Sequence, residues 1–256
     1  VNVVFSKANV GTPLEAVDTN PILSGVILET LVTTANTNAG VASGFTGGDA
    51  GEGLDLDGVF PYASNFGSPG AAPTPVRDAV FTPHDGTPGL TFRAPNQIPN
   101  WFGANFGSTT NDDNLESVMQ SIRWDTGGGD NGDVIIDLAN LEIGKQYQLQ
   151  LMFADNGTAR GFDVFAENQL IFDDFNPGPL QGSPQSQGGA LLTWNFTATD
   201  PVLNLHLFGP SAPFGDQNPI INGLTLEELP IPEPATAGLA MMALAGLGLR
   251  RRSRKA

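Results

Sequence analysis

The stretch QYQLQLMF at Gln146–Phe153 decides the fold class of this 256-residue chain. Leu149 and Leu151 lie on one side of an extended backbone, and Gln148 and Gln150 lie on the other. This two-residue period is typical of a β-strand that has one face in a core and one face in water. The segment therefore predicts a strand whose leucines are buried and whose glutamines are solvated.

Similar alternation recurs in six other runs, at residues 134–138, 162–167, 170–175, 191–198, 202–208 and 221–229. Seven short strands separated by turn-rich segments predict an all-β, antiparallel, jelly-roll-like β-sandwich. Apolar runs at residues 3–5, 22–34, 58–60 and 79–83 predict strands that complete the sheets. We expect one body over residues 1–228; two subdomains divided near Gly107 are the alternative.

One short helix is expected beside this sandwich. Asn111 or Asp112 is a suitable N-cap, because short polar side chains accept hydrogen bonds from the first free N–H groups of a helix. Apolar residues follow at helical spacing: Leu115, Val118, Met119 and Ile122. The helix is expected to pack across one end of the sandwich.

The chain is strongly acidic, and its charge is unevenly distributed along the sequence. The chain has 11 basic and 27 acidic residues, but five of the basic ones lie within residues 250–256. Up to Ile231, six basic residues face 26 acidic ones, a net charge of −20. Such a surface repels phosphate backbones, so nucleic acid is not an expected partner. The absence of cysteine excludes disulfides, thiol catalysis and cysteine-ligated metals.

The C-terminal residues 229–256 form a separate unit with three parts in order. Pro232, Glu233 and Pro234 form an extended motif, because proline fixes φ and biases the preceding residue away from helix. The uncharged segment Ala235–Leu249 predicts a hydrophobic helix about 22 Å long at 1.5 Å per residue, marginal for spanning a membrane. A basic cluster then follows, made of Arg250, Arg251, Arg252 and Arg254, with Lys255. The positive-inside rule keeps this end in the cytoplasm.

This arrangement resembles the PEP-CTERM sorting signal of Gram-negative bacteria. The resemblance implies processing by an exosortase-type enzyme and transient insertion of the precursor in the inner membrane through the tail. It also implies export to the cell envelope or the extracellular space. An ordinary tail anchor or a buried core helix is the alternative. The chain begins at Val1 rather than at a methionine. We expect that a signal peptide preceded this residue and was removed; the alternative is that the sequence is a fragment.

The body carries a second resemblance, between Leu141 and Leu226. The order of its motifs is IGKQYQLQLMFAD, RGFDVF, LIFDDF, LTWNFTATD, VLNLHLF and PIINGLTLEEL. This order is similar to that of malectin-like and other galactose-binding-like jelly rolls. Families of this kind often bind carbohydrate, although a shared fold does not by itself confer that function.

Catalytic chemistry is not expected. His84 and His206 fit no known catalytic spacing, and no nucleophile motif is present. Asp173 and Asp174 are adjacent, so on a regular strand their side chains would diverge and could not act as a pair. The chain is therefore predicted not to be an enzyme.

Calcium is the metal that the sequence favours, although no cofactor is required. Asp130 and Asp133 lie in the glycine-rich loop at residues 127–133, and acidic residues also gather in residues 47–58. Calcium takes six to eight oxygen ligands, often from such loops. Neither loop fits an EF-hand, and ordinary turns are the favoured explanation of the same residues.

The best candidate for a glycan-binding surface is the loop NWFGANFG. Trp101 and Phe106 would stack on sugar rings, while Asn100 and Asn105 would bond to hydroxyl groups. Aromatic plugs at the end of the core are the alternative. Arg160 is expected to form an ion pair with Asp163 or Asp155. We therefore expect an exported, noncatalytic surface or matrix protein that binds glycan; a purely structural component and a secreted carbohydrate-active hydrolase are the alternatives.

Overall fold

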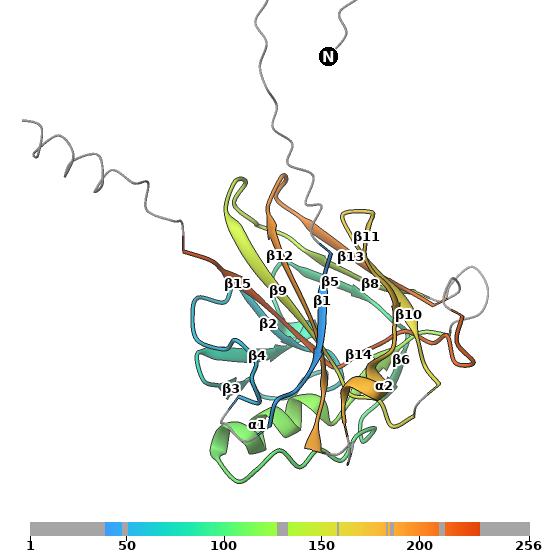
Figure 1. Ribbon diagram of the computed structural model, residues 1–256. Helices are drawn as coiled ribbons and strands as arrows, with labels where there is room; N and C mark the ends of the chain where they lie inside the picture. The colour runs from blue at the N-terminus through green and yellow to red at the C-terminus, as the bar shows by residue number, and fades with distance from the viewer. Residues whose placement is uncertain are drawn as a thin grey trace, which may run out of the picture. The chain divides into compact units, whose positions relative to one another are not determined.

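The structure is a computed structural model that describes residues 39–47, 51–126, 133–157, 159–182, 184, 187–209 and 213–230 (Figure 1). The strands predicted at residues 3–5 and 22–34 lie outside the described residues, as does the predicted tail helix Ala235–Leu249. Among the described residues, no helix has the length and apolar character needed to cross a bilayer.

The larger sheet of the body has seven strands. Their order is β1 (Val41–Gly44), β12 (Ala190–Thr197), β9 (Gln146–Phe153), β15 (Gly223–Glu228), β2 (Tyr62–Asn65), β4 (Ala79–Pro83) and β3 (Thr74–Val76). All neighbours are antiparallel except β2 and β4. The strand predicted at 58–60 is absent, and β2 begins two residues beyond it.

A five-stranded sheet faces the larger one across the sandwich (Figure 1). Its order is β11 (Gln169–Phe175), β10 (Phe162–Ala166), β13 (Leu203–Phe208), β8 (Asp133–Leu138) and β5 (Leu90–Arg93). A small third sheet joins β14 (Ile220–Ile221), β7 (Ile122–Trp124) and β6 (Asn96–Ile98). The predicted antiparallel β-sandwich is confirmed.

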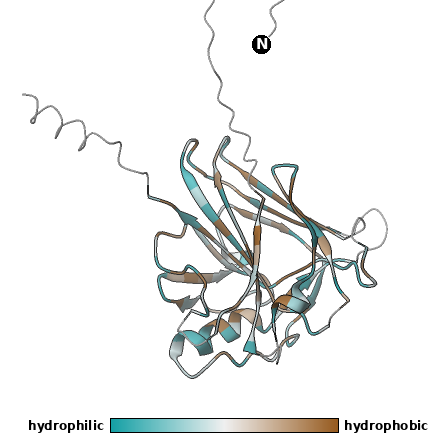
Figure 2. Ribbon diagram, viewed as in Figure 1, coloured by the Kyte–Doolittle hydropathy of each residue, from teal (hydrophilic) through white to brown (hydrophobic). Residues whose placement is uncertain are grey.

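The main core fills the space between the two large sheets. Leu149 and Leu151 of β9 are fully buried there with Leu205 and Leu207 of β13. Polar and apolar residues alternate along the strands of the body (Figure 2). The period-2 pattern therefore identified the inward face correctly.

A second core lies on the outer face of the seven-stranded sheet, so the prediction of a solvated glutamine face is wrong at its centre. Met152 of β9 is fully buried in this cluster. Gln150 is 1% exposed, and its Nε2 donates to Asp55 O at 2.6 Å and to Thr225 Oγ1 at 3.0 Å. Its Oε1 accepts the Asp55 N–H at 3.0 Å. The buried amide is thus satisfied, and alternation alone could not reveal the layer above it.

The helix α1 (Thr110–Met119) supplies much of that second layer. It begins after Thr109 rather than at Asn111 or Asp112. Thr109 Oγ1 accepts the Asp112 N–H at 3.2 Å, and Asp112 Oδ2 accepts the Thr109 N–H at 2.9 Å. This reciprocal capping box fixes the helix start. The predicted helical residue Ile122 belongs instead to β7.

Two short helices complete the body, α2 (Pro177–Leu180) and the 3-10 helix η1 (His84–Gly86). The single strand predicted at 221–229 is divided at Asn222 into β14 and β15. Asn222 Oδ1 accepts the Ala154 N–H at 2.7 Å, and its Nδ2 donates to Met119 O and Ser121 O. One buried side chain therefore joins β9, α1 and the entry to β7.

Candidate functional site

The loop predicted to present aromatic rings is tied to the body at its first residues. The backbone N–H groups of Trp101 and Phe102 both donate to Gln120 O, at 2.9 and 3.0 Å. Trp101 is half-buried, and its Nε1 donates to Ala154 O at 3.1 Å. Trp101 therefore anchors the start of the loop to the body, because its ring is half covered and its N–H is hydrogen-bonded.

The four candidate glycan-binding residues do not form one exposed platform. Phe106 is buried in the second core, where its ring lies 5.5 Å from that of Phe45. Asn100 and Asn105 are exposed at opposite ends of the loop. Only Asn105 and Phe106 border the same cavity, whereas Trp101 and Asn100 are not part of its lining.

That cavity is a cleft of about 430 Å³ formed by three segments far apart in the sequence. It lies between the end of β1, the loop before α1 and the segment between α2 and β12. Its lining consists of Phe45, Thr46, Gly47, Asn105, Phe106, Gly107, Gln181, Pro184 and Gln187. The volume falls within the range usual for small-ligand sites.

Close backbone approaches shape the cleft. A Cβ atom at Gly44 would overlap the carbonyl oxygen of Leu180, and one at Gly188 would overlap that of Gln181. Only glycine permits these approaches. The glycines therefore bring β1 and the start of β12 against the end of α2, where Gln181 begins the polar wall.

Gln181 is the most constrained polar group of this wall. Its side chain is 4% exposed, and its Oε1 accepts the backbone N–H of Asp155 at 2.6 Å. Within the described part of the chain, its Nε2 has no hydrogen-bond acceptor. A buried amide donor without a partner is costly, which makes this atom a candidate ligand contact.

Behind Gln181 lies a buried ionic network. Arg160 Nε donates to Asp155 Oδ1 at 3.2 Å, and its Nη2 lies 2.8 Å from Asp216 Oδ2. The guanidinium also lies 5.7 Å from the centre of the Trp101 ring. Burial raises the pKa of Asp155, and the nearby charge of Arg160 partly offsets this effect. Of the two predicted partners of Arg160, Asp155 is thus the one that it contacts by an ion pair.

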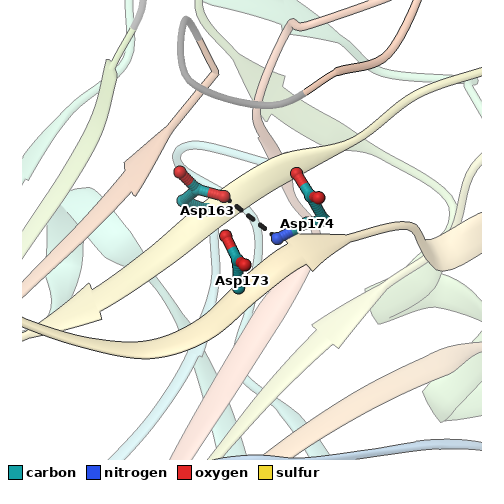
Figure 3. A group of neighbouring side chains, drawn as sticks. All are labelled: Asp163, Asp173 and Asp174. Carbon is teal, nitrogen blue, oxygen red and sulfur yellow. Dashed lines mark hydrogen bonds between the residues drawn. The ribbon is translucent and has the colours of Figure 1, made fainter.

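Asp163 instead belongs to a group of three carboxylates on the hairpin of β10 and β11 (Figure 3). Oxygen atoms of Asp163, Asp173 and Asp174 all lie within 4.8 Å of one another. The expectation that Asp173 and Asp174 diverge is wrong, because the register shifts between Phe162 and Val164 and Asp174 adopts φ +53°. Such a bulge interrupts the alternation of side chains.

Asp133, one of the two candidate calcium ligands, is already engaged by an arginine. Its carboxylate lies 3.2 Å from Arg93 Nη2 and 3.2 Å from His206 Nε2. The other candidate, Asp130, lies outside the described residues. A carboxylate paired in this way fits a calcium ligand poorly, since the positive charge of Arg93 beside it would repel the metal. No step of the proposed function depends on calcium.

The two histidines take structural positions. His84 packs against the rings of Phe66 and Phe92, which also contact each other, and its Nε2 lies 3.5 Å from Arg123 Nη2. Burial lowers the pKa of His84, and the Arg123 charge lowers it further. His206 lies on the outer face of the five-stranded sheet, 5.8 Å from the ring of Phe165. Neither histidine lines the cleft.

The C-terminal tail places the chain in a class of exported proteins. Residues 230–255 match the PEP-CTERM protein-sorting motif, which includes Pro232–Pro234 and the arginine cluster. This motif marks proteins that are sorted through the membrane to the cell envelope or the exterior. The chain is thus an exported protein with a sorting tail. No curated protein sequence matches it.

The body is similar to malectin-like ectodomains of plant receptors. The ANXUR1 extracellular domain from Arabidopsis thaliana matches with a TM-score of 0.52 and 13% identity, over 68% of this chain and 51% of that one. The ANXUR2 extracellular domain gives 0.52 and 12% over the same shares. A calcium-binding mutant of Bacteroides uniformis beta-glucuronidase 2 gives 0.47 and 13%, over 69% and 19%. The chain therefore spans about half the length of the ectodomains, and the likeness concerns the fold alone.

Proposed function

We propose that this exported protein is a noncatalytic component of the cell envelope or extracellular matrix that binds glycan in the 430 Å³ cleft. The observation that carries the proposal is the Gln181 side chain in the wall of this cleft, whose buried Nε2 has no acceptor among the described residues. A ligand hydroxyl that reached this atom after a small shift of the side chain would satisfy the donor. The malectin-like fold of the body supports the same class of function.

The chemistry of the wall suits a sugar. Phe45, which is half-buried, offers apolar surface to the C–H face of a pyranose ring, while the amides of Asn105, Gln181 and Gln187 can each donate and accept hydrogen bonds. Sugars present the same combination of an apolar face and a rim of hydroxyl groups. The described lining carries no ionised side chain, which favours an uncharged glycan over an anionic one.

The same lining supports a binding role rather than hydrolysis. Glycoside hydrolysis uses two carboxyl groups that flank the scissile bond, about 5–9.5 Å apart. None of the described residues that line the cleft is an Asp or a Glu. The three carboxylates of the β10–β11 hairpin belong to different elements from those that form the cleft.

Binding to uncharged polysaccharides tests the proposal, with retention in affinity gels measured for paired variants. Asn105→Ala should reduce retention, since its exposed amide lines the cleft. Asn100→Ala is the matched control, because this asparagine is also exposed but lies outside the lining. Equal retention of both variants would contradict the proposed site.

The melting temperature separates binding from stability in these experiments. Both asparagines are exposed, so both variants should melt within a few degrees of the parent protein. If no glycan is retained by the parent protein itself, the purely structural role in the matrix is the function that remains.

A further inference from the structure

The tail leaves the body at one end of the sandwich, next to two other segments. The backbone N–H of Leu229 donates to Gln146 O at 2.9 Å, and that of Glu228 donates to Val59 O at 2.8 Å. Pro230, the last residue that the structure describes, follows directly. A tight turn ends just before Gln146. These segments lie side by side, and we call them the tail-side end: Val59, Glu142–Lys145 and Glu228–Pro230.

Two large aliphatic side chains of the tail-side end are exposed to water. Ile143 is 64% exposed, and Val59 is 67% exposed. Among the described residues, only five large hydrophobic side chains are exposed, and these are two of them. A single exposed apolar residue is ordinary on a protein surface. Two such residues beside the start of a hydrophobic tail indicate an apolar environment that both of them share.

The turn that carries Ile143 is rigid. The Lys145 N–H donates to Glu142 O at 3.1 Å, and Gly144 adopts φ +87°, as the third residue of a type II turn must. The segment after β12 fixes the turn from one side. The Gly144 N–H donates to Ala198 O at 2.8 Å, and the Ala198 N–H donates to Lys145 O at 2.9 Å. Ile143 is therefore held at the corner of the turn, with most of its surface in solvent.

The length of the chain limits how far this end can move from a membrane. Ala235, where the uncharged tail segment begins, lies five residues beyond Pro230. A fully extended chain spans at most about 18 Å over that length. When the tail segment is inserted in the inner membrane, the tail-side end therefore stays close to the lipid surface.

The cleft lies at the other end of the sandwich. Thr197 of β12 pairs with Gln146 at the start of β9, whereas Ala190 pairs with Phe153 at the far end of β9. Gln187 in the cleft wall lies just before Ala190 in the chain. The length of β9 separates the two ends by about 24 Å, at about 3.4 Å per residue. The tail-side end and the cleft therefore lie at opposite ends of β9.

The charge of the tail-side end suits a zwitterionic lipid surface. Lys145 Nζ lies 2.8 Å from Glu142 Oε2 and also bonds to Glu228 Oε1, so one cation compensates part of the acidic charge there. The body as a whole is strongly acidic, with six basic and 26 acidic residues up to Ile231. An anionic lipid surface would repel such a body.

We propose that the tail-side end rests on the lipid surface while the tail is inserted, with Ile143 and Val59 entering the interfacial region of the bilayer. This inference rests on insertion of the tail and not on glycan binding. Two aliphatic side chains bind a membrane weakly by themselves, but the tail holds them beside it at a high effective concentration. The cleft then faces away from the membrane and is accessible to glycan before the tail is processed.

Fluorescence quenching tests this proposal on the full chain, reconstituted in phosphatidylcholine vesicles that contain lipids with a nitroxide on the head group. The chain has no cysteine, so one introduced cysteine carries the fluorophore. Thr199→Cys places it at an exposed residue next to Ala198. Asn100→Cys is the position control, because the neighbouring Trp101 bonds to Ala154 O beyond the far end of β9. The label at Thr199 should be quenched, and the label at Asn100 should not.

Paired substitutions show which side chains make the contact. Ile143→Ser with Val59→Ser should release the tail-side end from the lipid surface, because both apolar groups are lost, and so reduce the quenching at Thr199. Val41→Ser with Val80→Ser is the matched control, since it removes two valines that are exposed elsewhere on the body. This control should leave the quenching unchanged.

The outcomes decide between the orientations. A loss of quenching confined to the tail-side double variant supports the proposal. Equal quenching at Thr199 and Asn100, or no effect of the tail-side double variant, would overturn it. A label on Met242→Cys, in the tail segment, reports insertion through lipids with a nitroxide on the acyl chain. No quenching there would overturn both the insertion and the orientation that rests on it. Glycan retention by the cleft is measured separately, so a failure of that function is distinguishable from a failure of this one.

Discussion

Gln181 and Asp155 are joined by a 2.6 Å hydrogen bond in which the Gln181 side-chain oxygen accepts the Asp155 backbone N–H. The bond connects the wall of the cleft to the ion pair between Asp155 and Arg160. Changes on either side of this bond should therefore affect both the stability of the body and the shape of the cleft.

Gln181→Ala should lower the free energy of unfolding by about 1–3 kcal/mol, because it leaves the buried Asp155 N–H without an acceptor. Urea denaturation of the two proteins measures the difference. Gln187→Ala is the control, since Gln187 lines the same cleft but is exposed, and its replacement should cost less than about 0.5 kcal/mol. Equal losses would show that the hydrogen bond contributes nothing specific.

Arg160→Met should be more damaging, because it leaves the Asp155 carboxylate buried without its cation. Removing one partner of a buried ion pair typically costs about 3–5 kcal/mol. Arg77→Met removes one partner of an exposed pair with Asp57 and should cost about 0–1 kcal/mol. Thermal unfolding of both variants provides the comparison, and similar melting temperatures would contradict the proposed difference.

Substitutions along β9 test the two cores. Leu151→Ala should cost about 2–5 kcal/mol, as large-to-small changes in a core do. Gln150→Ala should cost about 1–3 kcal/mol, because its amide satisfies both polar groups of the Asp55 backbone. Gln148→Ala, at a half-buried position, should cost less than either, and chemical denaturation ranks the three.

Stability should depend on pH through the β10–β11 hairpin. Burial raises the pKa of Asp163, and the charges of Asp173 and Asp174 raise it further. The hydrogen bond from the Asp174 N–H lowers this pKa and offsets part of the increase. Since the folded pKa exceeds the unfolded value, the folded state binds this proton more tightly. The contribution of Asp163 to stability should therefore increase as the pH falls from neutral through its folded pKa, and level off below its ordinary value of 3.8.

The same hairpin provides the control for this pH dependence. Asp163→Asn removes the titrating group, so the stability difference between parent and variant should change with pH over that window. Denaturation curves at several pH values measure it. A difference that stays constant from pH 7 to about pH 4 would show that Asp163 does not titrate differently on folding.

The sorting tail should be cleaved in the native host. Glu233→Ala alters the matched Pro232–Pro234 motif and should cause an unprocessed, membrane-retained precursor to accumulate. Intact mass spectrometry of the released protein should show loss of the residues after about Pro234, since the arginine cluster at the tail end favours the cytoplasm. Released protein that still carries Arg250–Ala256 would contradict processing at this motif.

The alternation of residues in the C-terminal half predicted most of the sandwich, because burial on one face of a strand leaves a direct trace in the sequence. It could not predict which polar residues are covered by a second layer, as Gln150 is. Nor could it predict the bulge at Asp173 and Asp174, which depends on the pairing of β10 with β11.

Less of the site was predictable than of the fold. The loop that contains Asn105 and Phe106 was identified by its composition, and these two residues do line the cleft. Gln181 was missed, because nothing in a turn-rich segment distinguishes a glutamine that folding will bury. The close approaches at Gly44 and Gly188 indicate that the segment around Gln181 is packed, but only when the positions of the neighbouring segments are known.

Strand β9 contributes side chains to both cores, with Leu151 in one and Met152 in the other. Neither hydrophobic cluster can therefore open without disturbing the strand on which the other depends. The body should open as a single cooperative unit, and amide hydrogens of β9 should be among the slowest to exchange with solvent. For a protein exported from the cell, this coupling would limit partial opening and so restrict the access of proteases to either core.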